Sequence, residues 1–189
     1  MEDILRTIGE RKGAVSLDII KSEIKVYFSF ISEAIEILEK EGFIRSQQGS
    51  FKLTEKGERR AKAILRKHSV FEGYFERTKT KKEAHEIAHI LEHYVSEEVI
   101  NNIKKLSTFK GKGNSLTKLK IHKSGLITNI AIPNSRLFER MASMGIFPGE
   151  EITIVNEVPN AIIIKIKNNK FALDKEIAES IKVLEYEKS

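Results

Sequence analysis

The sequence predicts an α+β fold, with helices in the first half of the chain and short strands in the last third. Apolar residues recur at helical spacing up to residue 106, whereas later apolar and polar residues alternate in short runs between glycines, prolines and asparagines. A glycine- and lysine-rich stretch, residues 110–118, lies between the two patterns and predicts a linker. We therefore expect domains at residues 1–66, 67–109 and 119–189.

The composition limits the classes of protein. The chain has 189 residues and no cysteine, so it forms no disulfide and offers no thiolate as a nucleophile or metal ligand. No apolar run reaches the roughly 20 residues that a membrane-spanning helix needs. The first residues, MEDILRTIGE, lack the pattern of a secretory signal. We expect a cytoplasmic protein with no membrane partner.

Positive charge is concentrated in two stretches of the chain. The formal net charge is +6. Residues 45–67 hold eight Lys or Arg against two acids, and residues 104–123 hold seven Lys and no acid. Such clustering is compatible with a nucleic-acid partner, although net charge alone does not establish one.

The first part of the chain predicts three helices followed by a hairpin. Helical spacing covers residues 2–11, residues 17–24 after a capping Ser16, and residues 28–41. FIRSQ and SFKLT are extended runs on either side of a short turn. Three helices with a two-stranded wing form a winged helix-turn-helix, whose third helix reads DNA. The alternative is a small helical domain with no role at DNA; the order of elements and the basic stretch favour DNA binding.

The expected DNA contacts depend on phosphate charge and DNA shape more than on base reading. The third helix has no Arg before its end, so it cannot make the bidentate contact of Arg with guanine. Modest base contacts are expected from Ser29, Phe30 and Ser32. Phosphate contacts are expected from six basic residues, namely Lys21, Lys25, Arg45, Lys52, Arg59 and Arg60.

A dense cluster of imidazole and carboxylate groups lies in the sequence HEIAHILEH, residues 85–93. It holds three of the five histidines of the chain and two glutamates. The cluster falls in the second of two predicted helices, residues 55–77 and 81–106. One stripe of this helix is apolar, and a separate stripe carries His85, His89, Glu92 and His93. A solvated face normally carries Lys and Glu, so three histidines on one are unusual. Imidazole and carboxylate together are ligands of divalent transition metals, and the stripe therefore favours a metal site.

A second pair of candidate ligands lies on the preceding helix. His68 and Glu72 are four residues apart, so both lie on one face of that helix. Such a pair is common by chance and alone would be interpreted as surface. The break at residues 78–80 folds this helix back against the helix that holds His85, which makes the pair a candidate for a shared site.

Residues 85–89 also fit the H-E-x-x-H motif of zinc peptidases. In that chemistry His85 and His89 would hold zinc and Glu86 would be the general base. A third protein ligand and an open position for water would also be needed. No phosphate loop and no serine elbow accompany the motif. A zinc metallohydrolase and a metal storage or delivery protein therefore stay as alternatives from other classes.

The last part of the chain predicts a small β-rich domain. KLKIHKSGLITNIA, GEEITIVNEV, AIIIKIKNNKFAL and IKVLE are strand-like runs with turns between them. SRLFERMASMGI is a short helix among them. This pattern predicts a small β-barrel of the SH3 type.

Four segments, in this order, resemble the metal-dependent repressors of the diphtheria toxin repressor family. MEDILRTI, LTEKGERRAKAILRKH and HEIAHILEHYVSEEV are similar to its DNA-binding and dimerisation domains. The stretch from GLITNIAIPNSRLFERMASMGIFPGEEITIV to FALDKEIAESIKVL is similar to the ferrous-iron-transport A protein, an SH3-like module. The resemblance covers essentially the whole chain. It implies a homodimeric repressor of metal-uptake genes that binds double-stranded operator DNA and is neither an enzyme nor a receptor for a small organic substrate.

The resemblance also implies two metal sites. The primary, activating site would use Asp3, His89, Glu92 and His93. The ancillary site would use His68, Glu72 and His85. In this arrangement the H-E-x-x-H match is incidental, and Glu86 has no catalytic role.

Departures from the family pattern bear on the metal. Arg6 stands where manganese-type members have a second acid, as it does in iron-type members. Asp3 stands where iron-type members have Met, and His89 where they often have Cys. Asn134 and Leu137 fall where the best-known iron repressor has a Glu and a Gln ligand. Nitrogen and oxygen donors suit Fe(II), Mn(II), Co(II) or Zn(II); we expect Fe(II), with Mn(II) as the close alternative.

The resemblance finally predicts how metal would act. A metal held between Asp3 and the helix of His89 would fix the DNA-binding domain against the dimerisation domain. In a homodimer this sets the spacing of the two recognition helices. Dimerisation is expected to use apolar side chains of the two middle helices: Phe71, Tyr74, Phe75, Leu91 and Tyr94.

Overall fold

The chain folds into two compact units, Met1–Ser69 and Val70–Ser189. Over the described residues no helix is long and apolar enough to cross a membrane. Lys25 and Asn134, two positions named above, lie outside the described part of the chain. The computed structural model describes residues 1–11, 13–24, 28–108, 113–131 and 135–185.

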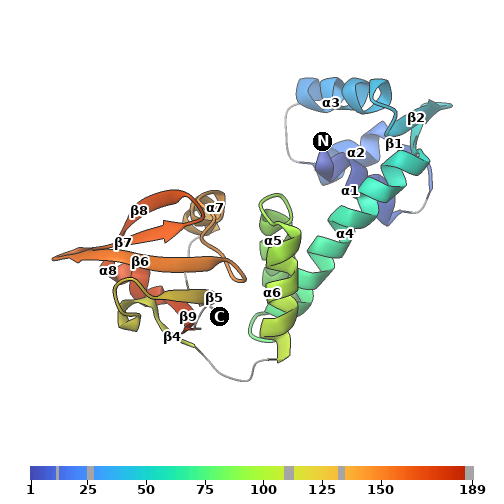
Figure 1. Cartoon of the computed structure of the whole chain (residues 1–189). Coiled ribbons are helices and arrows are strands. Elements are labelled where there is room, and N and C mark those ends of the chain that lie inside the picture. Colours follow the sequence, from blue (N-terminus) through green and yellow to red (C-terminus); the bar gives the residue numbers. More distant parts are fainter. Residues whose placement is uncertain (12, 25–27, 109–112, 132–134, 186–189) are drawn as a thin grey trace. The chain divides into compact units, whose positions relative to one another are not determined.

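The first unit contains the predicted three helices and a small antiparallel sheet (Figure 1). Ser16 caps the second helix as the sequence predicted, because its side chain accepts a hydrogen bond from the backbone N–H of Ile19 at 3.4 Å. The helices are α1 (Glu2–Glu10), α2 (Leu17–Glu23) and α3 (Phe28–Lys40). The sheet has the order β1 (Val15–Ser16), β3 (Ser50–Leu53) and β2 (Ile44–Gln47).

The hairpin of β2 and β3 is the predicted wing. Gln47 pairs with Ser50, which leaves a turn of two residues, Gln48 and Gly49. Their φ angles are 50° and 75°. A type I′ turn needs positive φ at both positions, and its twist matches that of the flanking strands. The turn therefore fixes the register of the wing.

Helix α4 (Glu55–Phe75) begins in the first unit and continues without interruption into the second. After a short turn, Thr80 starts α5 (Lys81–Leu91) with a capping box. The Thr80 hydroxyl accepts a hydrogen bond from the backbone N–H of Glu83, and the Glu83 carboxylate accepts one from the backbone N–H of Thr80. This cap fixes where the histidine-bearing helix begins.

The predicted single helix over residues 81–106 is wrong, because the helix ends at Leu91 and a second helix, α6 (Glu97–Thr108), follows. Glu92 is the C-cap of α5, and the backbone N–H of Tyr94 donates to the carbonyl of Leu91. Ser96 then caps α6, since its side chain accepts from the backbone N–H of Val99 at 3.3 Å. His93 therefore lies in a turn and not on the stripe of α5.

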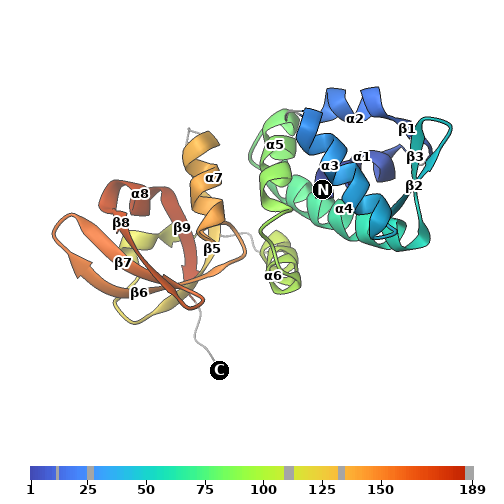
Figure 2. The same cartoon turned by 90° about the horizontal axis from the view of Figure 1, so that it is seen from above.

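The rest of the second unit is one antiparallel sheet with two short helices (Figures 1 and 2). Its strands are β4 (Asn114–Ser115), β5 (Ser124–Ile130), β6 (Glu151–Val158), β7 (Ala161–Ile166), β8 (Asn169–Asp174) and β9 (Ile181–Glu185). Their order is β4-β9-β5-β6-β7-β8. The helices are α7 (Ser135–Ser143) and α8 (Lys175–Ser180), and η1 (Leu116–Lys118) is a single 3-10 turn.

Two parts of this sheet domain differ from the sequence-based expectation. Residues 114–118, expected as the end of a linker, form β4 and η1, and Leu116 is fully buried. Leu116 was not recognised as a core residue because its neighbours in the sequence are mostly glycine, lysine and polar residues. Helix α8, which was not predicted, follows β8 directly and buries Ala178.

The helices and the sheet domain of the second unit share one apolar core. Phe71, Phe75 and Leu91, which we expected at a dimer interface, are at most 2% exposed and belong to this core. Tyr74 packs against it and donates its hydroxyl to the carbonyl of Thr128 at 2.6 Å. Of the five residues predicted for dimerisation, Tyr94 alone keeps a large exposed fraction, 40%. The prediction for Phe71, Phe75 and Leu91 is therefore wrong, because residues of the same chain cover these side chains, whereas Tyr74 is half-buried and stays a predicted dimer contact together with Tyr94.

Candidate metal centre

A buried carboxylate lies at the break between α5 and α6. Glu92 is 1% exposed. Its Oε1 lies 3.5 Å from Nδ1 of His89 and 3.7 Å from Nε2 of His93. The end of α5 at Leu91 allows imidazoles from before and after the break to approach the same carboxylate oxygen.

A second pair of candidate ligands joins α4 to α5. Oε1 of Glu72 lies 3.2 Å from Nδ1 of His85. The two side chains are 24% and 47% exposed, so this pair contacts solvent. The rings of His85 and His89 meet edge to face, with 4.8 Å between their centroids. The outer pair, Glu72 and His85, is thus continuous with the cluster around Glu92.

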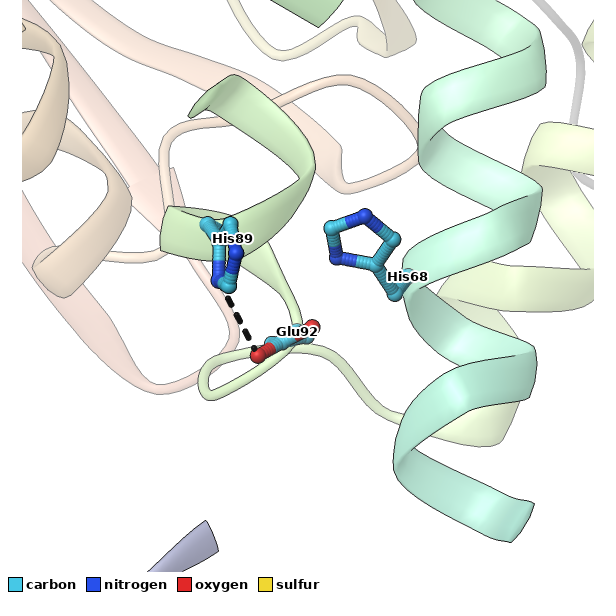
Figure 3. Close-up of side chains that lie close together, drawn as sticks. All are labelled: His68, His89 and Glu92. Atoms are coloured by element: carbon cyan, nitrogen blue, oxygen red, sulfur yellow. Dashed lines mark ion pairs between the residues drawn. The ribbon is translucent and has the colours of Figure 1, made fainter. Parts of the chain in front are cut away.

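His68 lies next to both sets of ligands. It is on α4, one turn before Glu72, so the uninterrupted helix fixes its place relative to that residue. Its side chain is buried, with 5% exposed. Ligand atoms of His68, His89 and Glu92 lie within 4.8 Å of one another, and Figure 3 shows the three side chains around a common space. We call these three residues the inner group.

The same spacing joins His68 to the outer pair, since ligand atoms of His68, Glu72 and His85 also lie within 4.8 Å of one another. The sequence analysis assigned His68 to the ancillary site only. The structure groups it with candidate ligands of both sites. The division between the two sites is therefore less sharp than the sequence suggested.

The remaining ligand candidate, Asp3, lies in the first turn of α1 and is half-buried. Arg6, one turn further along, is buried and forms an ion pair with Glu10 at 2.7 Å. That ion pair neutralises the guanidinium within α1 itself. Asp3 lies close to the N-terminus of a helix, where a carboxylate is favoured.

The donor set fits a divalent transition metal. It consists of imidazole nitrogens and carboxylate oxygens, which bind Fe(II), Mn(II), Co(II) and Zn(II). Burial of Glu92 argues in the same direction, because a buried carboxylate is costly without a compensating cation or hydrogen-bond donors. Glu86 is exposed on α5 and belongs to none of the groups of candidate ligands found among the described residues. The inner group therefore suits metal binding without a separate catalytic base.

The residues predicted to contact DNA bases begin helix α3. Ser29 and Phe30 are exposed, and the Phe30 side chain shows 61% of its surface to solvent. Ser32 is half-buried. An exposed phenyl ring at the start of a recognition helix is available for apolar contact with bases.

The predicted phosphate contacts differ in how they are held. Arg45 is exposed on β2, and Lys52 is half-buried on β3. Lys21 lies 4.0 Å from Asp18. Arg59 forms an ion pair with Glu55 at 2.6 Å, and Arg60 forms one with Glu2. Both arginines are therefore neutralised in part by residues of their own unit.

The sheet domain contributes none of the candidate ligand groups found among the described residues. Leu137 is half-buried and packs against the core of the second unit. An apolar side chain in this position cannot ligate a metal. The hydrogen bond from Tyr74 to Thr128 was not foreseen, because nothing in the sequence pairs α4 with β5.

Comparison with known proteins identifies two domains. Residues 54–111 match the family model described as "Iron dependent repressor, metal binding and dimerisation domain". Residues 114–185 match the family model described as "FeoA domain". The first match covers all the candidate ligands except Asp3. No curated protein matches the chain.

Solved structures share the fold over nearly the whole chain. A "Manganese-dependent transcriptional repressor complex with manganese" is 22% identical, with a TM-score of 0.52, and the match covers 98% of this chain and 99% of that one. The IdeR protein of T. acidophilum is 22% identical, with a TM-score of 0.51, over 98% and 97% of the two chains. The manganese regulator SloR is 22% identical, with a TM-score of 0.50, over 98% of each chain. The predicted α+β fold, a helical part followed by an SH3-like sheet domain, is thereby confirmed.

Proposed function

We take as premise that the chain joins the metal binding and dimerisation domain of iron dependent repressors to a FeoA domain, and we propose that it is a metal-activated transcriptional repressor of the diphtheria toxin repressor type. The matched domains belong to a regulator and a metal-transport module, so the zinc-hydrolase alternative has no support beyond the H-E-x-x-H letters. One observation carries the proposal. Glu92, a carboxylate that is 1% exposed, lies among imidazoles at the break after α5.

The proposed activating site uses Asp3, His89, Glu92 and His93, and the proposed ancillary site uses His68, Glu72 and His85. A bound divalent ion would supply the positive charge that compensates the buried carboxylate. His68 and Glu72 hold α4 to α5 through this cluster, and Asp3 extends it to the DNA-binding unit. In this proposal the ligands of the two sites come from α1, from α4, from α5 and from the turn after α5.

We propose Fe(II) as the physiological metal, with Mn(II) as the close alternative. The FeoA domain and Arg6 favour iron, since Arg6 removes the second acid of the manganese-type pattern. The donor set alone accepts Fe(II), Mn(II), Co(II) or Zn(II). The solved manganese repressor of the same fold supports manganese as the alternative.

At DNA, the proposed protein acts as a homodimer on a double-stranded operator of metal-uptake genes in the cytoplasm. The exposed residues at the start of α3 enter the major groove, and the wing with Arg45 and Lys52 contacts phosphates. Since α3 offers no Arg to guanine, charge and DNA shape supply most of the affinity.

DNA binding across metals tests this proposal and separates it from its alternatives. Affinity for duplex DNA is measured anaerobically with Fe(II), Mn(II), Co(II) and Zn(II), over a series of salt concentrations. A repressor gains affinity with at least one metal and loses affinity steeply as salt rises. A storage protein binds metal with no change in DNA affinity, and a hydrolase ignores duplex DNA; either result would refute the proposal.

A further inference from the structure

The sheet domain meets the helices of the second unit through an unusually close backbone contact. Gly149, in the turn before β6, has a φ of +90°. A Cβ at this position would lie 2.9 Å from Cγ1 of Ile103 and 3.0 Å from Cγ1 of Val99, both on α6. Glycine is therefore required here for two independent reasons, its φ angle and the approach of α6.

Two hydrogen bonds join the helices to the sheet domain, one at this contact and one between α4 and β5. The side-chain amide of Asn102, on α6, donates to the carbonyl of Gly149 at 3.0 Å. The hydroxyl of Tyr74, on α4, donates to the carbonyl of Thr128, on β5, at 2.6 Å. Both acceptors are backbone carbonyls of the sheet domain. The two hydrogen bonds therefore fix the position of this backbone relative to α4 and α6. Helix α7 also contacts α5.

The contact lies close, along the chain, to the residues of the proposed activating site. Val99 belongs to the first turn of α6, and this helix directly follows the turn that carries Glu92 and His93. Val95, within that turn, and Val99 are 5% and 2% exposed, and both belong to the core shared with the sheet domain. A displacement of α6 would therefore move the turn that presents the buried carboxylate.

We propose that docking of the sheet domain on α6, through Gly149 and Asn102, positions Glu92 and His93 and raises the affinity for metal without donating a ligand. The inference rests on the proposed function, because it concerns the same metal site. By linkage, metal binding must strengthen docking by the same factor by which docking strengthens metal binding. Gly149 and Asn102 are thus positioning residues that act through α6.

The test compares metal affinity in two docking variants and one matched control. Gly149→Ala introduces the Cβ that collides with α6, and Asn102→Ala removes one hydrogen bond without a collision. Gly42→Ala is the control, since Gly42 also has a positive φ, +74°, but has nothing within 4 Å of its added Cβ. The full chain is titrated with Mn(II), and the retained fold is checked by circular dichroism.

We expect Gly149→Ala to bind Mn(II) about tenfold more weakly than the wild type and Asn102→Ala about threefold more weakly. Gly42→Ala should keep the wild-type affinity. In the wild type, Mn(II) should also slow hydrogen exchange of the Gly149 N–H, which donates to the carbonyl of Ile127 at 2.8 Å. This readout does not depend on DNA or on repression.

Equal affinities of the wild type and both docking variants would overturn the inference while leaving the proposed function intact. If Gly149→Ala does not fold, Asn102→Ala decides alone, and a wild-type affinity in that variant would overturn the inference. If the wild type binds none of Fe(II), Mn(II), Co(II) and Zn(II), the proposed function fails, and the inference fails with it. A loss of affinity in Gly42→Ala equal to that in Gly149→Ala would assign the effect to backbone strain and refute docking.

Discussion

The inner group and the outer pair contain the same types of ligand but differ in burial. In the inner group, His68 is 5% exposed and Glu92 is 1% exposed. In the outer pair, the His85 side chain is 47% exposed and that of Glu72 is 24% exposed. A buried carboxylate costs free energy unless it is compensated, whereas an exposed ion pair is solvated at little cost. If a cation binds, its effect on stability should therefore be larger at the inner group than at the outer pair.

Glu150 provides a reference for this comparison within the same unit. It is a second buried carboxylate, 7% exposed, and Lys167 supplies a cation from the protein itself, with Nζ 3.2 Å from Oε2. Glu92 has imidazoles in place of a lysine. The two buried carboxylates thus differ in their neighbours, a lysine beside Glu150 and two imidazoles beside Glu92.

The largest effect is expected for Glu92→Gln. The substitution keeps the shape of the side chain but removes the charge, so metal affinity should fall by more than the roughly 100-fold that changes outside the ligand shell can cost. Titration with Mn(II) measures the loss. Glu86→Gln, an exposed change on α5, is the control and should leave the affinity unchanged. A loss of only a few-fold in Glu92→Gln would remove the inner group from the proposed activating site.

The second-largest effect is expected on stability. Metal should stabilise the folded chain, because it binds the native state. At a free metal concentration 100 times the Kd, the free energy of unfolding should rise by about 2.7 kcal/mol. Urea denaturation with Mn(II) and with a chelator measures the gain. The gain should nearly vanish in Glu92→Gln and persist in His85→Ala. Equal gains in both variants would show that burial does not distinguish the two groups.

A smaller effect is expected when the reference carboxylate loses its lysine. Burial, with Glu98 and Glu151 adding to it, raises the pKa of Glu150 above its ordinary value, and Lys167 opposes this. Lys167→Met should lower the free energy of unfolding at pH 7 by about 1 kcal/mol, because the buried charge loses its partner.

The direction of the pH dependence follows from the raised pKa. The folded state holds the Glu150 proton to higher pH than the unfolded state, so this group's contribution to stability is complete below its unfolded pKa. That contribution is lost as pH rises through the folded pKa. The deficit in the free energy of unfolding of Lys167→Met should therefore shrink on acidification. Adding Glu150→Gln to Lys167→Met should restore stability at pH 7. Urea titrations at several pH values measure this; a deficit that grows on acidification would contradict the assignment.

The smallest effect is expected for the outer pair. His85→Ala should weaken Mn(II) binding by less than about tenfold, because the outer pair contacts solvent and an exposed polar contact contributes at most about 1 kcal/mol. Isothermal titration of the variant and the wild type measures the difference. A loss as large as that in Glu92→Gln would mean that the two groups form a single site.

Local signals in the sequence predicted most of the helices and the wing. Ser16 is a predicted cap that the structure confirms, and the short turn at Gly49 has the positive φ that such a turn needs. The break after Leu91 escaped prediction because apolar spacing continues through Val95 and Val99 as if the helix did not stop. Ser96 was the available signal, since it caps the new helix.

The sequence could not predict which apolar faces are covered inside the chain. Phe71 and Leu91 have the same apolar character whether they meet a second subunit or the sheet domain. Their burial depends on segments far along the chain, since both belong to a core that also contains strands of the sheet domain. Likewise, the position of His68 beside both ligand groups depends on the packing of α4 against α5. Periodicity along one helix contains neither kind of information.

The central claim, that metal couples the ligand cluster to DNA binding through Asp3, is tested most directly by the metal-induced gain in DNA affinity of Asp3→Ala. The affinity for a duplex selected from a random library is measured with Fe(II) or Mn(II) and with a chelator, and Asp18→Ala is the control. We predict a gain of at least about tenfold for the wild type and the control, and little or no gain for Asp3→Ala. A full gain in Asp3→Ala would contradict the account.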